Sequence, residues 1–342
     1  MLAFKKYSSI ENTYDKELLD KIRLEHLDAL PYVVQEKVHG ANCSFVTDGQ
    51  TVQFAKRTGL VEPGEAFYNY EELLERYRER VVRLFQQVKA KYADMENMLV
   101  YGEMFGGKYP HPDVKNFSTV LNIQKGVYYC PVHEFYGFDI YITGPDSRRY
   151  FPVDETNAFF EKGGILYAKT LFQGTLDECL AYPNDFPSHI AGWLGLPPIE
   201  GNICEGVVIR PVEPTFLGNG SRLLLKSKNS KFAEKKAVKK RQPALFVAPT
   251  YSEALNNQLA LAEAYVTENR LNNVISKIGQ VSVPKEMGKL IGLFSKDILE
   301  DYLKEHASDY ALLEKSEQKI LNRYVNKQAA DLIKKIQFQT KR

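Results

Sequence analysis

The sequence predicts an α+β protein, with antiparallel sheets and helices in its N-terminal part and a small all-helical C-terminal domain. Short apolar segments of strand type, separated by turn residues, recur up to about residue 236. The chain then becomes lysine-rich and is interrupted by Pro243 and Pro249, and only helical spacing follows. We therefore expect one domain at residues 1–236, a linker at 237–249 and a second domain at 250–342.

The expected elements of the first domain follow from local patterns. Helical spacing of apolar residues predicts helices over 14–27 and 71–92. Alternating or continuous apolar runs predict strands at 32–38, 42–47, 50–56, 98–104, 134–142, 203–210 and 222–228. In the second domain, residues 250–253 (TYSE) fit a capping box that opens a helix.

Composition restricts the kind of protein. The 342 residues carry a net charge of only +2, so local charge must carry any binding of nucleic acid. The four cysteines form no CxxC pair, which disfavours a zinc site and a disulfide framework. Neither a secretory signal nor a membrane-length apolar run is present. We expect a cytoplasmic protein, or one acting in a host cytoplasm if it is viral, without membrane contact.

The first hairpin gathers charged residues. If Asp48 and Gly49 form a two-residue turn, Gly40 lies opposite Arg57 and Asn42 opposite Ala55. The loop of residues 37–39 then lies beside Lys56 and Arg57.

A second hairpin is expected between strands 203–210 and 222–228. If Arg210 pairs with Ser221, Glu205 lies opposite Lys226. Lys226 and Lys228 are two residues apart and share one face of their strand. That face is either a cationic site or the solvated face of an edge strand.

Lys37, in EKVHGAN (36–42), is a candidate nucleophile. It must lose its proton to attack, and partial burial and neighbouring cations favour this. Cations at Arg57, Lys226 and Lys228 would also bind phosphate oxygens. Glu103 and Glu205 are candidate magnesium ligands, directly or through water, because magnesium prefers oxygen ligands.

Together these segments resemble the covalent nucleotidyltransferases, and most of all the RNA ligase 2 family, which includes phage RNA ligase 2 and the trypanosome RNA-editing ligases. The similarity lies in an ordered set of segments: EKVHGAN at 36–42, AKRTG at 55–59, YGEMFGG at 101–107, FYGFDI at 135–140, CEGVVIRP at 204–211 and LLLKSKNSKFAEKK at 223–236. FKKYSS at 4–9 and TENRLNNVISKIG at 267–279 extend it over nearly the whole chain. The resemblance implies an N-terminal nucleotidyltransferase domain of the ATP-grasp-like ligase adenylyltransferase type.

The resemblance implies roles for the residues around Lys37. Lys37 would be the nucleophile that becomes linked to AMP, and Glu36 would lie against the adenine edge. Phe138 would stack on the adenine ring. His39 would assist lysine adenylylation, and Asn42 the later sealing step.

Further roles concern phosphate, metal and RNA. Glu103 would contact the ribose or a metal-bound water, and Glu205 would support the metal. Arg57 would contact the ribose or the RNA 5′-phosphate, while Lys226 and Lys228 would bind the α-phosphate region. Asp139 also matches the family. Residues expected to contact the RNA substrate are Tyr7, Lys56, Arg57, Arg270, Asp297 and Asp301.

Simpler structural interpretations stand beside these roles. Phe138 fits a core position, Glu103 and Glu205 fit surface salt bridges, and His39 could cap its own loop. The basic tract 222–241, with nine lysines or arginines against one glutamate, is either a solvated linker or a contact to the RNA backbone. Segments 107–133 and 186–202 depart from the family, which leaves the substrate preference open.

The resemblance thus implies an ATP-dependent RNA ligase, acting in RNA repair, that seals 3′-hydroxyl and 5′-phosphate ends through a lysine–AMP intermediate. Its cofactors would be ATP and Mg²⁺, with Mn²⁺ as an alternative metal. Its partner would be RNA, as a nicked duplex or as free ends, and we expect a monomer. The alternatives are a DNA ligase, a GTP-using capping enzyme and a catalytically inactive RNA-binding relative. His39 and the helical C-terminal domain argue against the first two.

Overall fold

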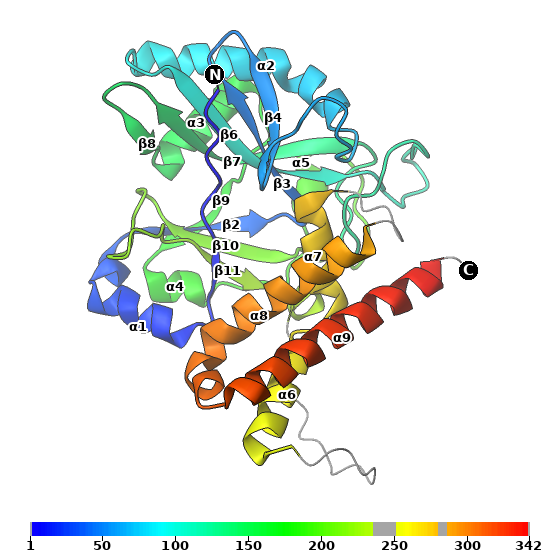
Figure 1. Ribbon diagram of the computed structural model, residues 1–342. Coiled ribbons are helices and arrows are strands. Elements are labelled where there is room, and N and C mark those ends of the chain that lie inside the picture. Colours follow the sequence, from blue (N-terminus) through cyan, green and yellow to red (C-terminus); the bar gives the residue numbers. More distant parts are fainter. Residues whose placement is uncertain (1, 235–250, 280–285, 341–342) are drawn as a thin grey trace. The chain divides into compact units, whose positions relative to one another are not determined.

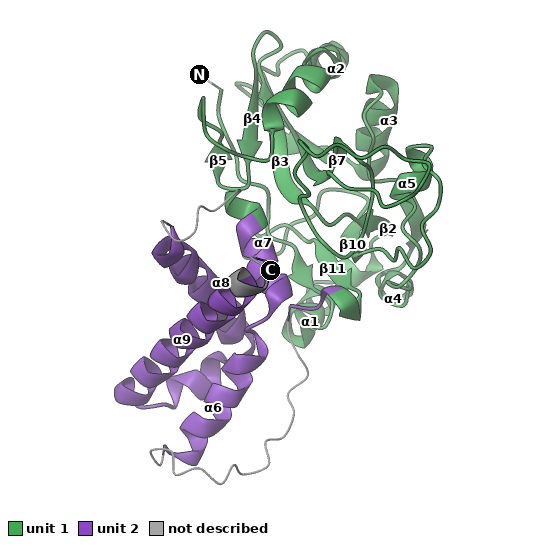
Figure 2. Cartoon of the chain, turned by 90° about the vertical axis from the view of Figure 1, so that its right-hand side faces the viewer, with its two compact units in different colours: residues 1–231, 276–279 green, residues 232–275, 280–342 purple. Residues whose placement is uncertain are grey.

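The computed structural model describes residues 2–234, 251–279 and 286–340. The chain forms two compact units, residues 1–231 with 276–279 (unit 1) and residues 232–275 with 280–342 (unit 2), which Figure 2 colours separately. The predicted linker 237–249 lies outside the described residues. The prediction of an α+β fold with antiparallel sheets and a helical C-terminal region is confirmed (Figure 1).

Unit 1 contains two sheets. The five-stranded sheet has the order β1-β11-β10-β2-β9, from strands Glu11–Asn12, Leu225–Lys228, Gly206–Pro211, Tyr32–Lys37 and Thr170–Gly174. The six-stranded sheet has the order β5-β4-β3-β6-β7-β8, from strands Gly59–Leu60, Val52–Lys56, Ala41–Thr47, Asn97–Gly106, His133–Thr143 and Arg148–Tyr150. Between these strands, all pairings are antiparallel except that of β1 with β11.

Helices cover these sheets. Those of unit 1 are α1 (Lys16–Leu24), α2 (Tyr70–Lys91), α3 (Val153–Gly163), α4 (Leu176–Leu180) and α5 (Ile190–Trp193), with 3-10 turns at Leu27–Ala29 and Ser230–Phe232. Helix α2 packs its apolar stripe on the six-stranded sheet, where Tyr77, Val81 and Phe85 join the core. Helix α1 packs Ile22 into a second core beneath the five-stranded sheet. Both helices occur where helical spacing predicts them.

Unit 2 is helical in its described part. Its helices are α6 (Glu253–Ala264), α7 (Glu268–Ile278, whose last residues are assigned to unit 1), α8 (Met287–Ala311) and α9 (Lys315–Thr340). Helices α6, α8 and α9 pack on one another. The predicted capping box at 250–253 is wrong, because the N-cap of α6 is Ser252, whose side chain accepts a hydrogen bond from the Leu255 N–H. No described helix has the length and apolar character needed to cross a membrane.

The first hairpin has a different register from the one predicted. Thr47 pairs with Val52 and Cys43 with Lys56, so the connection has four residues rather than two. The cause lies in Asp48, whose Oδ1 accepts hydrogen bonds from the N–H groups of Gln50 and Thr51. The shift is two residues, so each side chain keeps its predicted face of the sheet.

The second hairpin register is also wrong. Lys226 pairs with Val208, and Lys228 pairs with Gly206. The connection between β10 and β11 contains a turn of its own, closed by a bridge between Phe216 and Arg222. This turn changes which residues of the two strands lie opposite each other. With a shift of three residues, Lys228 rather than Lys226 takes the strand position next to Glu205, and its Nζ contacts the Glu205 carboxylate.

Candidate active site

Lys37 lies at the end of β2, against a buried carboxylate. Its Nζ is 2.7 Å from Glu205 Oε2. The pairing of β2 with β10 explains this contact, since Lys37 is opposite Gly206, the residue after Glu205. Lys228 Nζ lies 3.1 Å from the other oxygen of Glu205, and His39 Nδ1 lies 3.4 Å from Oε2. Burial alone would raise the pKa of Glu205, but Lys37, Lys228 and His39 hold it well below its usual range.

The loop after Lys37 crosses from the five-stranded to the six-stranded sheet. A Cβ atom at Gly40 would lie 2.2 Å from the carbonyl oxygen of Met104, so only glycine allows this approach to β6. The next strand, β3, pairs Asn42 with Glu103. The Asn42 Nδ2 group donates to the Gly102 carbonyl over 3.4 Å. The glycine of EKVHGAN therefore brings Lys37 to the face that carries Glu103.

Glu103, the second predicted metal ligand, has a pKa shifted in the opposite direction to that of Glu205. Burial raises its pKa to about 7, the charge of Glu205 adds to this rise, and Lys37 and Arg57 oppose it. Burial also lowers the pKa of Arg57, which the charge of Glu103 raises again. Lys37, Arg57, Glu103 and Glu205 thus act on one another electrostatically.

The pKa of Glu103 predicts a pH dependence of stability. Its folded-state pKa of about 7 lies above its ordinary value of 4.5, so the folded protein binds the proton more tightly than the unfolded chain. Stability is then complete below about pH 4.5 and falls as the pH rises through 7. A difference of this size between the two pKa values corresponds to a loss of about 3 kcal/mol. Urea denaturation at several pH values would measure it, and Glu103→Gln should remove this component; an unchanged pH profile in that variant would contradict the assignment.

Phe138 lies at a bulge in β7. Tyr101 of β6 pairs with Asp139 and Gly102 pairs with Gly137, so Phe138 has no partner of its own. Its ring is half-buried, 4.9 Å from the Tyr7 ring between centroids. A bulge that turns one aromatic ring away from the regular pleat suits a stacking surface.

Asp139 anchors this region through buried charges. Its Oδ2 accepts a hydrogen bond from Tyr7 Oη at 2.8 Å and pairs with Arg210 Nη1 at 3.2 Å and Arg222 Nη1 at 2.5 Å. Arg210 also donates to the Phe138 carbonyl at 3.1 Å. Tyr7 is buried, so a contact between Tyr7 and RNA stays a prediction that this position does not favour.

Glu36 points into the protein. Its carboxylate accepts hydrogen bonds from Ser188 Oγ (2.6 Å) and the His189 N–H (2.9 Å), and lies 3.1 Å from His189 Nδ1. Burial raises its pKa, and these three contacts lower it. Contact between the Glu36 side chain and adenine stays a prediction, since this carboxylate is already bound to segment 186–202.

Segment 107–133 also holds the loop after Lys37. The His39 N–H donates to Tyr129 Oη at 2.9 Å, and Gln124 Nε2 donates to the Gly40 carbonyl at 3.1 Å. Both partners are buried. The two segments in which the sequence departs from the family therefore contact the residues on either side of Lys37.

Two of the remaining candidates, Lys56 and Arg270, have acidic partners of their own. Lys56 pairs with Glu65 in a short ion pair. Lys226 lies half-buried opposite Val208. In unit 2, Arg270 Nη1 lies 2.8 Å from both Asp297 Oδ2 and Asp301 Oδ2 and 3.8 Å from Glu234 Oε2.

The acidic group of Glu234, Asp297 and Asp301 could geometrically hold a metal ion. Arg270 contacts all three carboxylates and Lys304 Nζ lies 3.3 Å from Asp301 Oδ1, so these cations offset part of the negative charge, and we assign the acidic group a structural role. Contacts of Arg270, Asp297 and Asp301 with RNA stay predictions.

Sequence reasoning missed several residues of this site. Ser188 and His189 reach Glu36 across more than 150 residues, and Tyr129 reaches His39 across 90; no local signal announces such contacts. The arginines that hold Asp139 did leave a signal. Arg210 and Arg222 stand within apolar runs, where a charged side chain needs a buried partner.

Two lysines contact one buried carboxylate, and Arg57 and Lys37 both act electrostatically on Glu103, so the site offers several cations that can bind phosphate oxygens. A family model described as RNA ligase matches residues 30–228, and one described as T4 RNA ligase 2 C-terminal matches residues 249–331. The chain therefore belongs to the RNA ligase 2 family and is an ATP-dependent RNA ligase.

Two RNA-editing ligases agree with this assignment. The chain is 32% identical to RNA-editing ligase 1, mitochondrial, of Trypanosoma brucei brucei over 82% of this chain and 71% of that protein. It is 26% identical to RNA-editing ligase 2, mitochondrial, of the same organism over 94% of this chain and 88% of that protein. A solved structure of Naegleria gruberi RNA ligase with AMP and Mn aligns with a TM-score of 0.45 and 16% identity, over 67% of this chain and 57% of that chain.

Proposed function

We propose that the protein seals RNA 3′-hydroxyl and 5′-phosphate ends, with nicks in duplex RNA as the preferred substrate, through a lysine–AMP intermediate on Lys37. The observation that carries the proposal is the contact of Lys37 Nζ with Glu205, which also pairs with Lys228 and lies beside His39. If Lys37 were only structural, one carboxylate would be enough to neutralise it. This site holds further cations beside Lys37, and such cations can bind phosphate oxygens.

The proposed reaction comprises three transfers. Lys37 Nζ loses a proton and attacks the α-phosphorus of ATP; the N–P bond forms and pyrophosphate leaves. An oxygen of the RNA 5′-phosphate then attacks the same phosphorus, and Lys37 leaves and regains a proton. Finally the 3′-hydroxyl attacks the activated 5′-phosphate, loses its proton and releases AMP. Lys228, Arg57 and Lys226 would stabilise charge on the phosphate oxygens, and Phe138 would hold the adenine.

Glu103 and Glu205 offer the oxygen donors that a divalent ion prefers, and both act electrostatically on Lys37. The donor set therefore fits magnesium or manganese. Such an ion would neutralise phosphate charge when bound. His39 lies on the loop and Asn42 on the strand that follow Lys37; His39 would assist lysine adenylylation, and Asn42 the later sealing step.

Incubation with α-labelled ATP and magnesium, followed by denaturing electrophoresis, tests the proposal. We expect acid-labile label on the protein, and labelling from GTP instead would indicate a capping enzyme. Absence of label from either nucleotide would indicate an inactive relative and overturn the proposal. Nicked duplexes with RNA, DNA or mixed strands would then show whether RNA nicks are preferred.

A further inference from the structure

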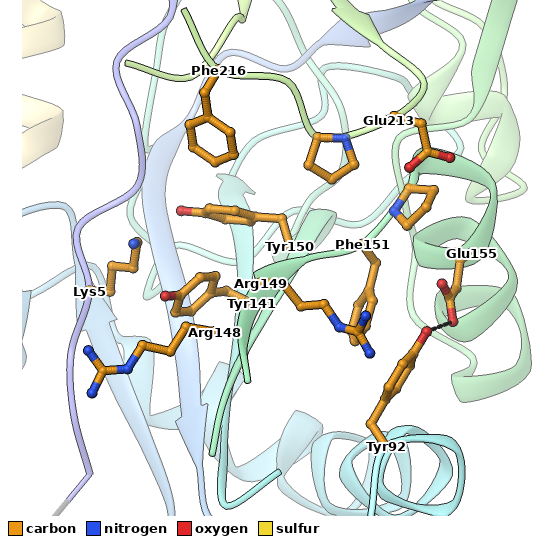
Figure 3. Close-up of a pocket in the computed structure, with 12 residues that line it drawn as sticks. Lys5, Tyr92, Tyr141, Arg148, Arg149, Tyr150, Phe151, Glu155, Glu213 and Phe216 are labelled. Carbon is orange, nitrogen blue, oxygen red and sulfur yellow. Dashed lines mark hydrogen bonds between the residues drawn. The ribbon is translucent and has the colours of Figure 1, made fainter. Parts of the chain in front are cut away.

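A pocket of about 430 Å³ opens on unit 1 and is lined by none of the residues assigned above to the active site. It lies between β7, β8, the end of α2 and the start of α3, with the N-terminal segment and the chain after β10 closing it (Figure 3). Its walls combine cations and aromatic rings. No role described above uses this pocket.

Three exposed cations line the pocket, namely Lys5, Arg148 and Arg149. Lys5 Nζ lies 4.4 Å from the centre of the Tyr141 ring, and Arg149 Cζ lies 4.3 Å from that of Tyr92. Within the described part of the chain, none of the three makes an ion pair. Contacts with ring faces hold Lys5 and Arg149 in place without neutralising them.

The acidic residues of the pocket do not cancel this charge. Glu155 Oε1 lies 2.6 Å from Lys91 Nζ and 2.7 Å from Tyr92 Oη, so it already has partners outside the cation group. Glu213 is exposed. The pocket therefore retains cations that can bind an anion.

An exposed ring completes the wall. Phe216 is 50% exposed, and in Figure 3 its ring lies on the same side of the pocket as Tyr150. The bridge between Phe216 and Arg222 fixes the backbone at this position. An exposed aromatic ring of this kind is a surface on which a flat ligand such as a nucleobase can stack.

We propose that this pocket binds an unpaired nucleotide of RNA outside the sealing site, with the base on Phe216 and the backbone phosphates on Lys5, Arg148 and Arg149. The proposal deepens the proposed function and rests on it, because it extends the RNA contact of the same enzyme. Rings supply stacking and fixed cations supply phosphate binding, which is how proteins hold single-stranded nucleic acid.

The test is fluorescence anisotropy of the full chain with a labelled single-stranded RNA and a labelled blunt RNA duplex, at several KCl concentrations. The double variant Arg148→Gln/Arg149→Gln should weaken binding of the single strand about tenfold and reduce the slope of log affinity against log salt by about 1.4. Phe216→Ala should weaken it about fivefold without changing that slope. The matched control Arg83→Gln/Lys162→Gln removes two exposed cations of the same unit and should bind like the wild type.

Affinity and slope equal to the control would overturn the proposal, and so would an equal loss on the blunt duplex, which offers no unpaired base. Thermal unfolding of each variant excludes loss of the fold as the cause. Labelling of the wild type by α-labelled ATP is measured in parallel. If the wild type is not labelled, the proposed function fails; if it is labelled and the pocket variants bind RNA normally, only the pocket assignment fails.

Discussion

Replacement of Lys37 by alanine is expected to remove all covalent labelling by ATP and to reduce sealing of 5′-phosphorylated RNA by at least about 10⁴-fold. The reason is chemical: the Lys37 amine, 2.7 Å from Glu205 Oε2, is the group that forms the bond to the α-phosphorus in the proposed reaction, and alanine has no nucleophile in its place. Labelling with α-labelled ATP and a nick-sealing assay measure the two effects.

Sealing of RNA that is already adenylylated separates the nucleophile from the rest of the site. Lys37 forms and breaks its bond to AMP before the last step, so Lys37→Ala should still seal this substrate within about tenfold of the wild type. Lys37→Arg keeps a cation against Glu205 but lacks the nucleophile, and should likewise take no label. Label on either variant would show that another lysine is the nucleophile.

The errors in strand register show what a local pattern can specify. The apolar runs predicted the strands of both hairpins, because the pattern of apolar residues along a strand shows by itself that the strand is buried. Register depends on the connections, and there Asp48 folds its carboxylate over the Gln50 and Thr51 N–H groups, while the second connection contains a bridged turn. In the first hairpin, a shift of two residues changed which residues are paired but left each side chain on its predicted face of the sheet. In the second hairpin, a shift of three residues placed Lys228 beside Glu205.

The site shows the same limit. Lys37 and Glu205 could be selected from the sequence because each stands at the edge of an apolar strand. The partners of Glu36 could not, since Ser188 and His189 lie in a segment without periodicity and act through tertiary contact. The partners of Asp139 could be predicted in part. A carboxylate within the apolar run 135–142 requires a buried cation, but the sequence does not say which residue supplies it.

Asp139→Asn is expected to destabilise unit 1 by about 3–5 kcal/mol. The Asp139 side chain is fully buried, and those of Arg210 and Arg222 are 3% and 2% exposed, so the substitution leaves two buried guanidinium groups without their counter-charge. For a unit of this size the loss corresponds to a fall in melting temperature of about 10 °C. Thermal and urea unfolding measure it.

The same substitution should weaken ATP binding, because Arg210 holds the Phe138 carbonyl and Tyr7 packs on the Phe138 ring. Asp146→Asn is the matched control, since it removes the charge of an exposed aspartate in the turn between β7 and β8. A melting temperature of Asp139→Asn equal to that of the control would show that the arginines find other counter-charges. Loss of stability without loss of ATP affinity would show that Phe138 keeps its position independently of Asp139.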